Sequence, residues 1–135
     1  MTSARLALTA VVAFIVTLGI GYGWGGSGRG VLMQALDDTK QQLDLAEARG
    51  ALLDARVSLY NVNFGDSSRH FEEAKAPLRR AQDRYQSAGK NEAAVSIAAS
   101  LEHAAEGQRL AGKLDQAANA KAGDALEAIR VATQK

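Results

Sequence analysis

Side chains able to carry out acid–base or metal chemistry are few and widely spaced in this chain of 135 residues. Cysteine is absent, which excludes thiolate zinc sites, cysteine-linked haem and cysteine nucleophiles. The two histidines are His70, just after a predicted turn, and His103, in the middle of a predicted helix. In an up-down bundle these places lie about a helix length apart, and no H-E-x-x-H spacing occurs. We therefore expect no metal site and no cofactor.

Carboxylates are numerous, but their spacing is typical of solvated helix faces. They lie mostly opposite the apolar stripes described below and alternate with lysine and arginine at i,i+4 distances. Acid–base catalysis needs groups with shifted pKa values held in a pocket, and the sequence shows no such cluster. We therefore predict that the protein is not an enzyme. The carboxylates that follow this pattern include Asp37, Asp38, Asp44, Glu47, Asp54, Glu72, Glu73, Glu102 and Glu106.

The composition favours an all-α protein and excludes other classes. A hydrophobic content of 47% argues against disorder, and a single proline among many alanine, leucine and glutamate residues favours helices. The 16 lysines and arginines are balanced by 15 aspartates and glutamates. There is thus no basic excess of the kind that binds nucleic acid.

Residues 1–24 are predicted to form a transmembrane helix. No charged residue occurs from residue 6 to residue 28, and this run is about long enough to cross a hydrocarbon core of roughly 30 Å. Tyr22 and Trp24, at its far end, suit the membrane–water interface. Arg5 before the span and acidic residues after it predict a cytoplasmic N-terminus, with the remainder in the periplasm of a cell with an inner membrane. The alternative is a cleaved signal peptide over residues 1–23.

The predicted span carries a face of small residues. Such residues let transmembrane helices approach closely, so this face is expected to dock against another transmembrane helix. The alternative is that small residues are simply common in such spans. The Gly-rich segment 25–30 is predicted to be a hinge, because glycine destabilises helices. The small residues of the span are Thr9, Ala13, Thr17, Gly21 and Gly25, with Gly19 and Gly23 alongside.

Residues 31–135 are predicted to form an up-down antiparallel bundle of three to four helices, over 31–64, 67–88, 91–111 and 115–132. A turn is expected within 107–115, with one continuous helix there as the alternative. Each helix has apolar residues at spacings of three and four, the pattern of a buried helix face. The stripes of the last three helices are Phe71, Ala74, Leu78, Ala81, Tyr85 and Ala88, then Ala94, Ile97, Leu101 and Ala104, then Ala118, Ala122, Leu126 and Ile129.

The first of these helices has the longest stripe, which we predict to be its core-facing seam. The stripe keeps a coiled-coil repeat over four heptads. A second row, Leu45, Leu52 and Leu59, is expected to flank it. Gly65 is expected to follow the helix in the left-handed conformation. The seam consists of Leu32, Leu36, Thr39, Leu43, Ala46, Gly50, Leu53, Val57, Tyr60 and Phe64.

Two sets of residues are candidate partner-docking sites. One is the basic side of the second helix, which either an acidic partner or the acidic first helix can neutralise. The other is the first turn, at one end of the bundle, where core packing is the simpler role for the aromatic residues. The basic side consists of Arg79, Arg80 and Arg84, and the turn site of Tyr60, Phe64, His70 and Phe71.

Together these features predict a non-enzymatic accessory or structural subunit of a larger membrane protein complex, of respiratory, photosynthetic or secretion type. One transmembrane helix would anchor it in the inner membrane, and a periplasmic bundle would brace the complex. Two alternatives stay open, a membrane-anchored ligand-binding or sensor bundle and a spacer that self-associates through the seam as a coiled coil. The expected partners are other membrane subunits and the lipid bilayer, with a homo-oligomer as a further option and nucleic acid excluded.

Overall fold

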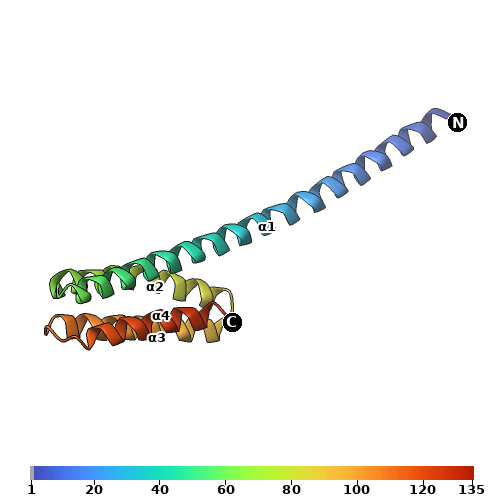
Figure 1. The fold of residues 1–135 in the computed structure, drawn as a ribbon. Helices are drawn as coiled ribbons and strands as arrows, with labels where there is room; N and C mark the ends of the chain where they lie inside the picture. The colour runs from blue at the N-terminus through green and yellow to red at the C-terminus, as the bar shows by residue number, and fades with distance from the viewer. Residues whose placement is uncertain (1) are drawn as a thin grey trace. The chain divides into compact units, whose positions relative to one another are not determined.

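The computed structural model describes the backbone of residues 2–135 and the side chains of residues 29–135. This part of the chain contains four α-helices and no β-strand, which confirms the all-helical prediction. Contacts divide the chain into two compact units, residues 1–38 and 39–135. The helices are α1 (Thr2–Tyr60), α2 (Phe64–Ser87), α3 (Asn91–Ala111) and α4 (Ala118–Ala132), as labelled in Figure 1.

The first unit is helical over its described backbone, including the segment 25–30 that was expected to be a hinge from its glycines. The predicted span 1–24, with its aromatic anchors and its face of small residues, lies outside the described side chains. Within the described side chains, no helix is both long enough and apolar enough to cross a membrane. Near the end of this unit, Val31, Leu32, Met33 and Leu36 are each more than half exposed.

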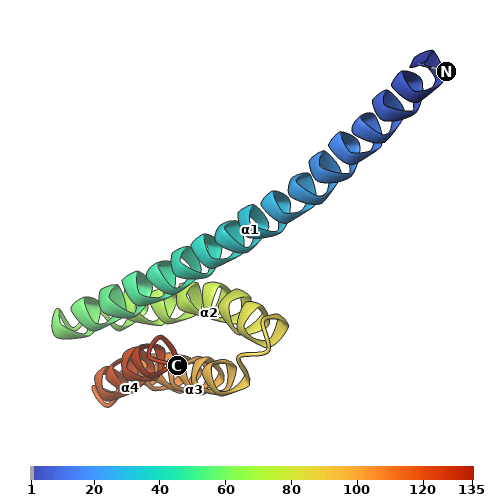
Figure 2. The same cartoon turned by 90° about the vertical axis from the view of Figure 1, so that its right-hand side faces the viewer.

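The second unit is an up-down helical bundle. Each helix runs back along the one before it, because the connections between them are short (Figures 1 and 2). The part of α1 from residue 39 onward lies beside α2, and α3 lies beside α4, so two layers of two helices enclose the core (Figure 2). The turn predicted within 107–115 is confirmed, since α3 ends at Ala111 and α4 begins at Ala118.

The core of the bundle contains most residues of the apolar stripes that the sequence predicts for α2, α3 and α4; Ala88 is exposed, and Leu101 and Leu126 are partly buried. Phe71 and Leu78 of α2, Ile97 of α3 and Ile129 of α4 are fully buried. Most other core residues of these helices are alanines, which allow close helix packing but bury little surface each. Helices α2 and α3 approach each other closely at Gly107, where an added Cβ would lie 2.5 Å from two atoms of the Phe71 ring.

The first three helices end in the same way, with one residue in the left-handed conformation. Gly89 (φ 73°) has this role after α2. After α1 the residue is Val62 (φ 58°), and the prediction of Gly65 is wrong, because Gly65 lies in the first turn of α2. Leu114 (φ 59°) follows α3. In all three cases the next backbone N–H donates to the carbonyl five residues earlier, and this bond satisfies the helix end.

The prediction for α1 is wrong about which face enters the bundle. The residues of α1 that pack in the core are the row expected only to flank the seam, together with two alanines. The predicted seam lies on the opposite side of the helix. Since both faces have the same alternation of three and four residues, periodicity alone does not distinguish them. The buried residues are Leu45, Ala48, Leu52, Ala55 and Leu59, each at most 2% exposed.

Candidate interaction surface

Within the bundle unit, α1 has two apolar faces. The inner face, defined by the five buried residues above, packs in the core. At 3.6 residues per turn, a second face lies about 160° around the helix from the first. We call this second face the outer stripe. It consists of Leu43, Ala46, Gly50, Leu53, Val57 and Tyr60.

The outer stripe is exposed to solvent. Leu43, Leu53 and Val57 are between 51% and 59% exposed, and Tyr60 is 88% exposed. Scattered apolar residues are normal on a protein surface, but a contiguous row on one helix marks a surface for association. Tyr60 was expected to pack in the core, and its exposure corrects that expectation. The outer stripe is therefore the candidate functional surface of the bundle.

An ion pair around a buried carboxylate helps to hold the inner face of α1 in the bundle. Asp44 is 5% exposed, and its two carboxylate oxygens accept hydrogen bonds from Arg80 Nε at 2.6 Å and Arg84 Nε at 3.0 Å. Arg80 also donates to Glu47 at 2.6 Å. A carboxylate is stable in a buried position only when hydrogen bonds and opposite charges satisfy it. Turning the outer stripe inward would therefore separate Asp44 from both arginines.

Sequence reasoning missed this role of Asp44, which it grouped with the solvated carboxylates. The signal that could have revealed it lies on α2. Arg80 and Arg84 are four residues apart and therefore project from the same side of that helix, where they can hold one carboxylate between them.

The opposite flank of α1 is held by the first turn of α4 and by Gln116, just before it. Arg56 Nε donates to Asn119 Oδ1 at 3.0 Å, and Gln116 Nε2 donates to the carbonyl of Leu59 at 3.3 Å. Toward α2, burial raises the pKa of the Tyr85 hydroxyl, and a hydrogen bond with Gln41 of α1 opposes that shift. Polar contacts on both flanks thus keep the inner face in place.

Replacing Asp44 with alanine is expected to lower the free energy of unfolding by about 2 to 3 kcal/mol, because charge-assisted hydrogen bonds are lost. At a concentration where the chain is monomeric, Asp54→Ala is the matched control, since Asp54 is exposed on the same helix. It should change the free energy of unfolding by less than about 0.5 kcal/mol. Urea unfolding followed by circular dichroism measures both. Equal losses would show that the Asp44 pair does not hold α1 against α2.

The three arginines of the predicted basic side have different surroundings. Arg80 and Arg84 donate hydrogen bonds to Asp44 of α1. For these two arginines the structure therefore agrees with the alternative that the acidic first helix neutralises the basic side. Arg79 is exposed. A hydrogen bond with Lys75 is the largest cause that lowers the pKa of Glu72, and the charge of Arg79 contributes less. An acidic partner would thus have to compete with Asp44 for two of the three arginines.

The four residues predicted around the first turn do not form one surface. Phe71 is fully buried, and Phe64 packs partly against the core. His70 Nδ1 lies 2.9 Å from Glu73 Oε2, and this hydrogen bond is the largest cause that lowers the pKa of Glu73. Of these four residues only Tyr60 has an exposed side chain, and it belongs to the outer stripe.

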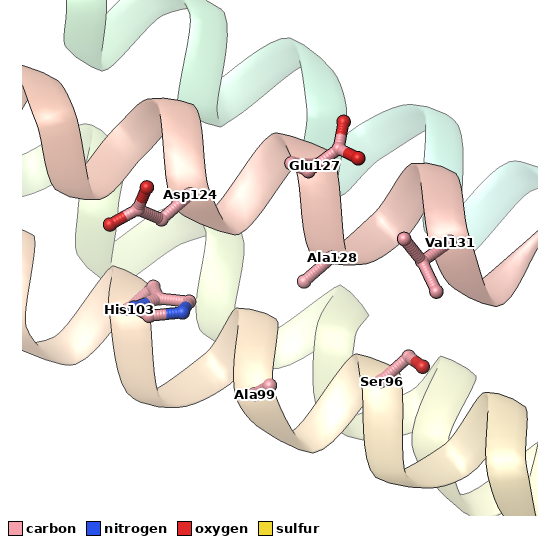
Figure 3. A pocket seen from close by; sticks show the side chains of 7 residues that line it. All are labelled: Ser96, Ala99, His103, Asp124, Glu127, Ala128 and Val131. Atoms are coloured by element: carbon pink, nitrogen blue, oxygen red, sulfur yellow. The ribbon is translucent and has the colours of Figure 1, made fainter.

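A shallow groove of about 520 Å³ lies between α3 and α4 (Figure 3). His103 of α3 and Asp124 of α4 approach it from opposite sides. A hydrogen bond from Lys121, at 2.9 Å, is the main cause that lowers the pKa of Asp124, and the charge of His103 contributes less. Among the described residues, no group of three or more acidic, histidine or cysteine side chains could hold a metal ion. The groove is lined by Ser96, Ala99, His103, Asp124, Glu127, Ala128 and Val131.

Comparisons with protein families, with curated proteins and with solved structures find no match to this chain. What the protein does therefore has to be inferred from its own residues and their geometry.

Proposed function

We propose that the protein is a non-enzymatic accessory or structural subunit of a larger membrane protein complex, of respiratory, photosynthetic or secretion type. Residues 1–24 would anchor it in the inner membrane with the N-terminus in the cytoplasm. The bundle would then lie in the periplasm and brace the complex.

The observation that carries this proposal is the pair of apolar faces on α1. The bundle covers the inner face with its own helices, and it leaves the outer stripe in solvent. Burial of apolar surface is the main driving force for protein association, so a helix built in this way is suited to be held against another helix. An accessory subunit needs such a surface and needs no catalytic group.

Copurification of the full-length chain after mild detergent extraction tests the proposal. Other membrane subunits should be recovered with it in a fixed ratio. In the predicted small-residue face, Ala13→Leu adds bulk and should reduce that recovery by about tenfold or more. Ala7→Leu makes the same change about 120° around the predicted helix from Ala13 and should leave recovery unchanged. A chain that migrates alone, even after cross-linking, would rule the proposal out.

A second candidate function is a ligand-binding or sensor bundle, favoured by the groove between α3 and α4. Its acidic groups are, however, already engaged on their own helix, since Lys121 binds Asp124 and Arg130 donates to Glu127 at 2.7 Å. A thermal-shift screen of small molecules, with a metal and haem scan, separates this candidate from the first. A ligand that stabilises the wild-type chain but not a His103→Leu variant would favour the sensor.

A further inference from the structure

We propose that the outer stripe binds the outer stripe of a second copy of this chain, in a parallel, in-register, two-stranded coiled coil. The inference deepens the proposed function, on which it rests, by naming the occupant of the exposed face. A membrane complex would then contain two copies of this subunit, joined along α1, with each bundle on the side of α1 that faces away from the joint.

The first argument is the width and period of the stripe. Its residues occupy two positions in every seven, with charged residues on both edges, which is the seam of a coiled coil. A helix that lies on a membrane surface or in the groove of a globular partner generally carries a wider apolar face. A seam this narrow is matched best by a helix with the same repeat, and a second copy supplies one.

The second argument is the identity of the residues in the seam. In heptad notation, Leu53 occupies a d position and Val57 an a position. At this layer a β-branched residue at a with leucine at d favours two strands over three or four, while the other a positions of the stripe hold Leu43 and Gly50. Ala46 and Gly50 lie between Leu43 and Leu53, and a Cβ built on Gly50 meets no atom within 4 Å in this chain. Two such helices can therefore approach closely at the middle of the stripe.

The third argument is the charge on the edges of the stripe, which selects the orientation. In a parallel, in-register pair, Arg49 of each copy faces Asp54 of the other, and symmetry makes this contact twice. The antiparallel pair would bring Lys40 near Asp54. It would also bring Glu47 against Glu47 and Arg49 against Arg49, and like charges there are destabilising. Only the parallel pair avoids every like-charge contact among these residues.

The fourth argument is length. The same spacing continues in the sequence before the bundle, through Leu36 and Leu32, which are 52% and 72% exposed. Within the bundle unit the outer stripe runs from Leu43 to Tyr60, over about 26 Å of helix at 1.5 Å per residue. In the sequence the repeat covers four heptads, although the first apolar residue of α1 that the bundle buries is Leu45.

Disulfide trapping in the full-length chain tests the inference cleanly, because the chain has no cysteine of its own. In a parallel, in-register pair the two copies of residue 53 share one layer and come within disulfide range. Mild oxidation of cells that make Leu53→Cys should therefore yield a covalent dimer. Val95→Cys is the control, since Val95 is an equally apolar, exposed residue on α3. The yield from Leu53→Cys should exceed the control by about tenfold or more.

Two further variants define the orientation and the surface. Leu43→Glu added to Leu53→Cys should reduce the dimer to the level of the control, because it introduces two glutamates into the seam. Coexpression of two chains, one with Leu43→Cys and the other with Leu53→Cys, distinguishes the two orientations. Only an antiparallel pair sets residue 43 of one copy opposite residue 53 of the other. The inference would be overturned if a covalent dimer formed only when both chains were coexpressed and not with Leu53→Cys by itself. It would also be overturned if the Leu53→Cys dimer were no more abundant than the Val95→Cys dimer.

These outcomes separate the inference from the proposed function. If other subunits copurify but Leu53→Cys gives no homodimer, the second copy is excluded and the accessory role stands. If the homodimer forms and no other subunit copurifies, the inference stands and the accessory role is excluded.

Discussion

Replacing Leu52 with alanine is expected to lower the free energy of unfolding by about 3 to 5 kcal/mol, because a fully buried leucine leaves a cavity in the core. The same replacement at the adjacent Leu53 should change the free energy of unfolding by less than about 0.5 kcal/mol, because that side chain is exposed. Two neighbouring leucines on one helix thus report on its two faces. Urea unfolding of the full-length chain in mild detergent, at a concentration where it is monomeric, measures both changes.

The control for this pair is built in, since both variants make the same chemical change in the same turn of α1. A larger loss at Leu53 than at Leu52 would mean that α1 packs with the outer stripe inward, as the sequence alone suggested. Equal and small losses would mean that α1 contributes little to the core of the bundle.

The second large effect is expected at Gly107 in α3. An alanine Cβ there would lie 2.5 Å from Cε1 and Cζ of Phe71, a ring that is fully buried and cannot move into solvent. Gly107→Ala should therefore destabilise the bundle by about 2 kcal/mol or more, although alanine is the better helix former. Thermal unfolding followed by circular dichroism measures the loss.

Gly123→Ala in α4 is the matched control, because nothing lies within 4 Å of a Cβ at Gly123. It should stabilise the bundle by about 0.5 to 1 kcal/mol through helix propensity alone. Phe71→Leu combined with Gly107→Ala should cost less than the sum of the two single changes, since the smaller side chain relieves the contact. A Gly107→Ala variant as stable as Gly123→Ala would show that α2 and α3 are not in such close contact.

Most of the bundle could be predicted from the sequence, because three of its helices have only one apolar face. The spacing of Phe71, Leu78 and Tyr85 has a single solution on α2, and Gly89 ends that helix where a left-handed residue is needed. The stripes of α3 and α4 are equally unambiguous, even though most of their core residues are alanines. The local sequence pattern predicted the buried face correctly wherever a helix has only one apolar face.

The rotation of α1 could not be predicted, because this helix has two faces with one period. The longer repeat predicts the core face, and the structure instead buries the shorter row. The clue against the longer repeat was length, since α2, α3 and α4 have 24, 21 and 15 residues and cannot cover a seam that begins at Leu32. The contact that holds the observed face inward, Asp44 with Arg80 and Arg84, joins residues 36 and 40 positions apart, so the periodicity of α1 itself does not reveal it.

The end of α1 was missed for a different reason. A glycine is the usual residue in the left-handed position after a helix, and Gly65 was the nearest one available. The chain instead places Val62 there, and the side chain of Asn63 accepts a hydrogen bond from the Asp66 N–H at 3.2 Å to begin α2. The cap on the next helix therefore determines the position of the turn, at the cost of an unfavourable conformation for valine.

The central claim is that the outer stripe of α1 is covered in the assembled protein. The rate at which a maleimide labels a single cysteine in living cells tests it most directly, with Leu53→Cys on the stripe and Val95→Cys on α3 as the exposed reference. If the stripe is covered, the thiol at position 53 should react about tenfold more slowly than the thiol at position 95, because thiol labelling requires access. Equal labelling rates at the two positions would contradict the account.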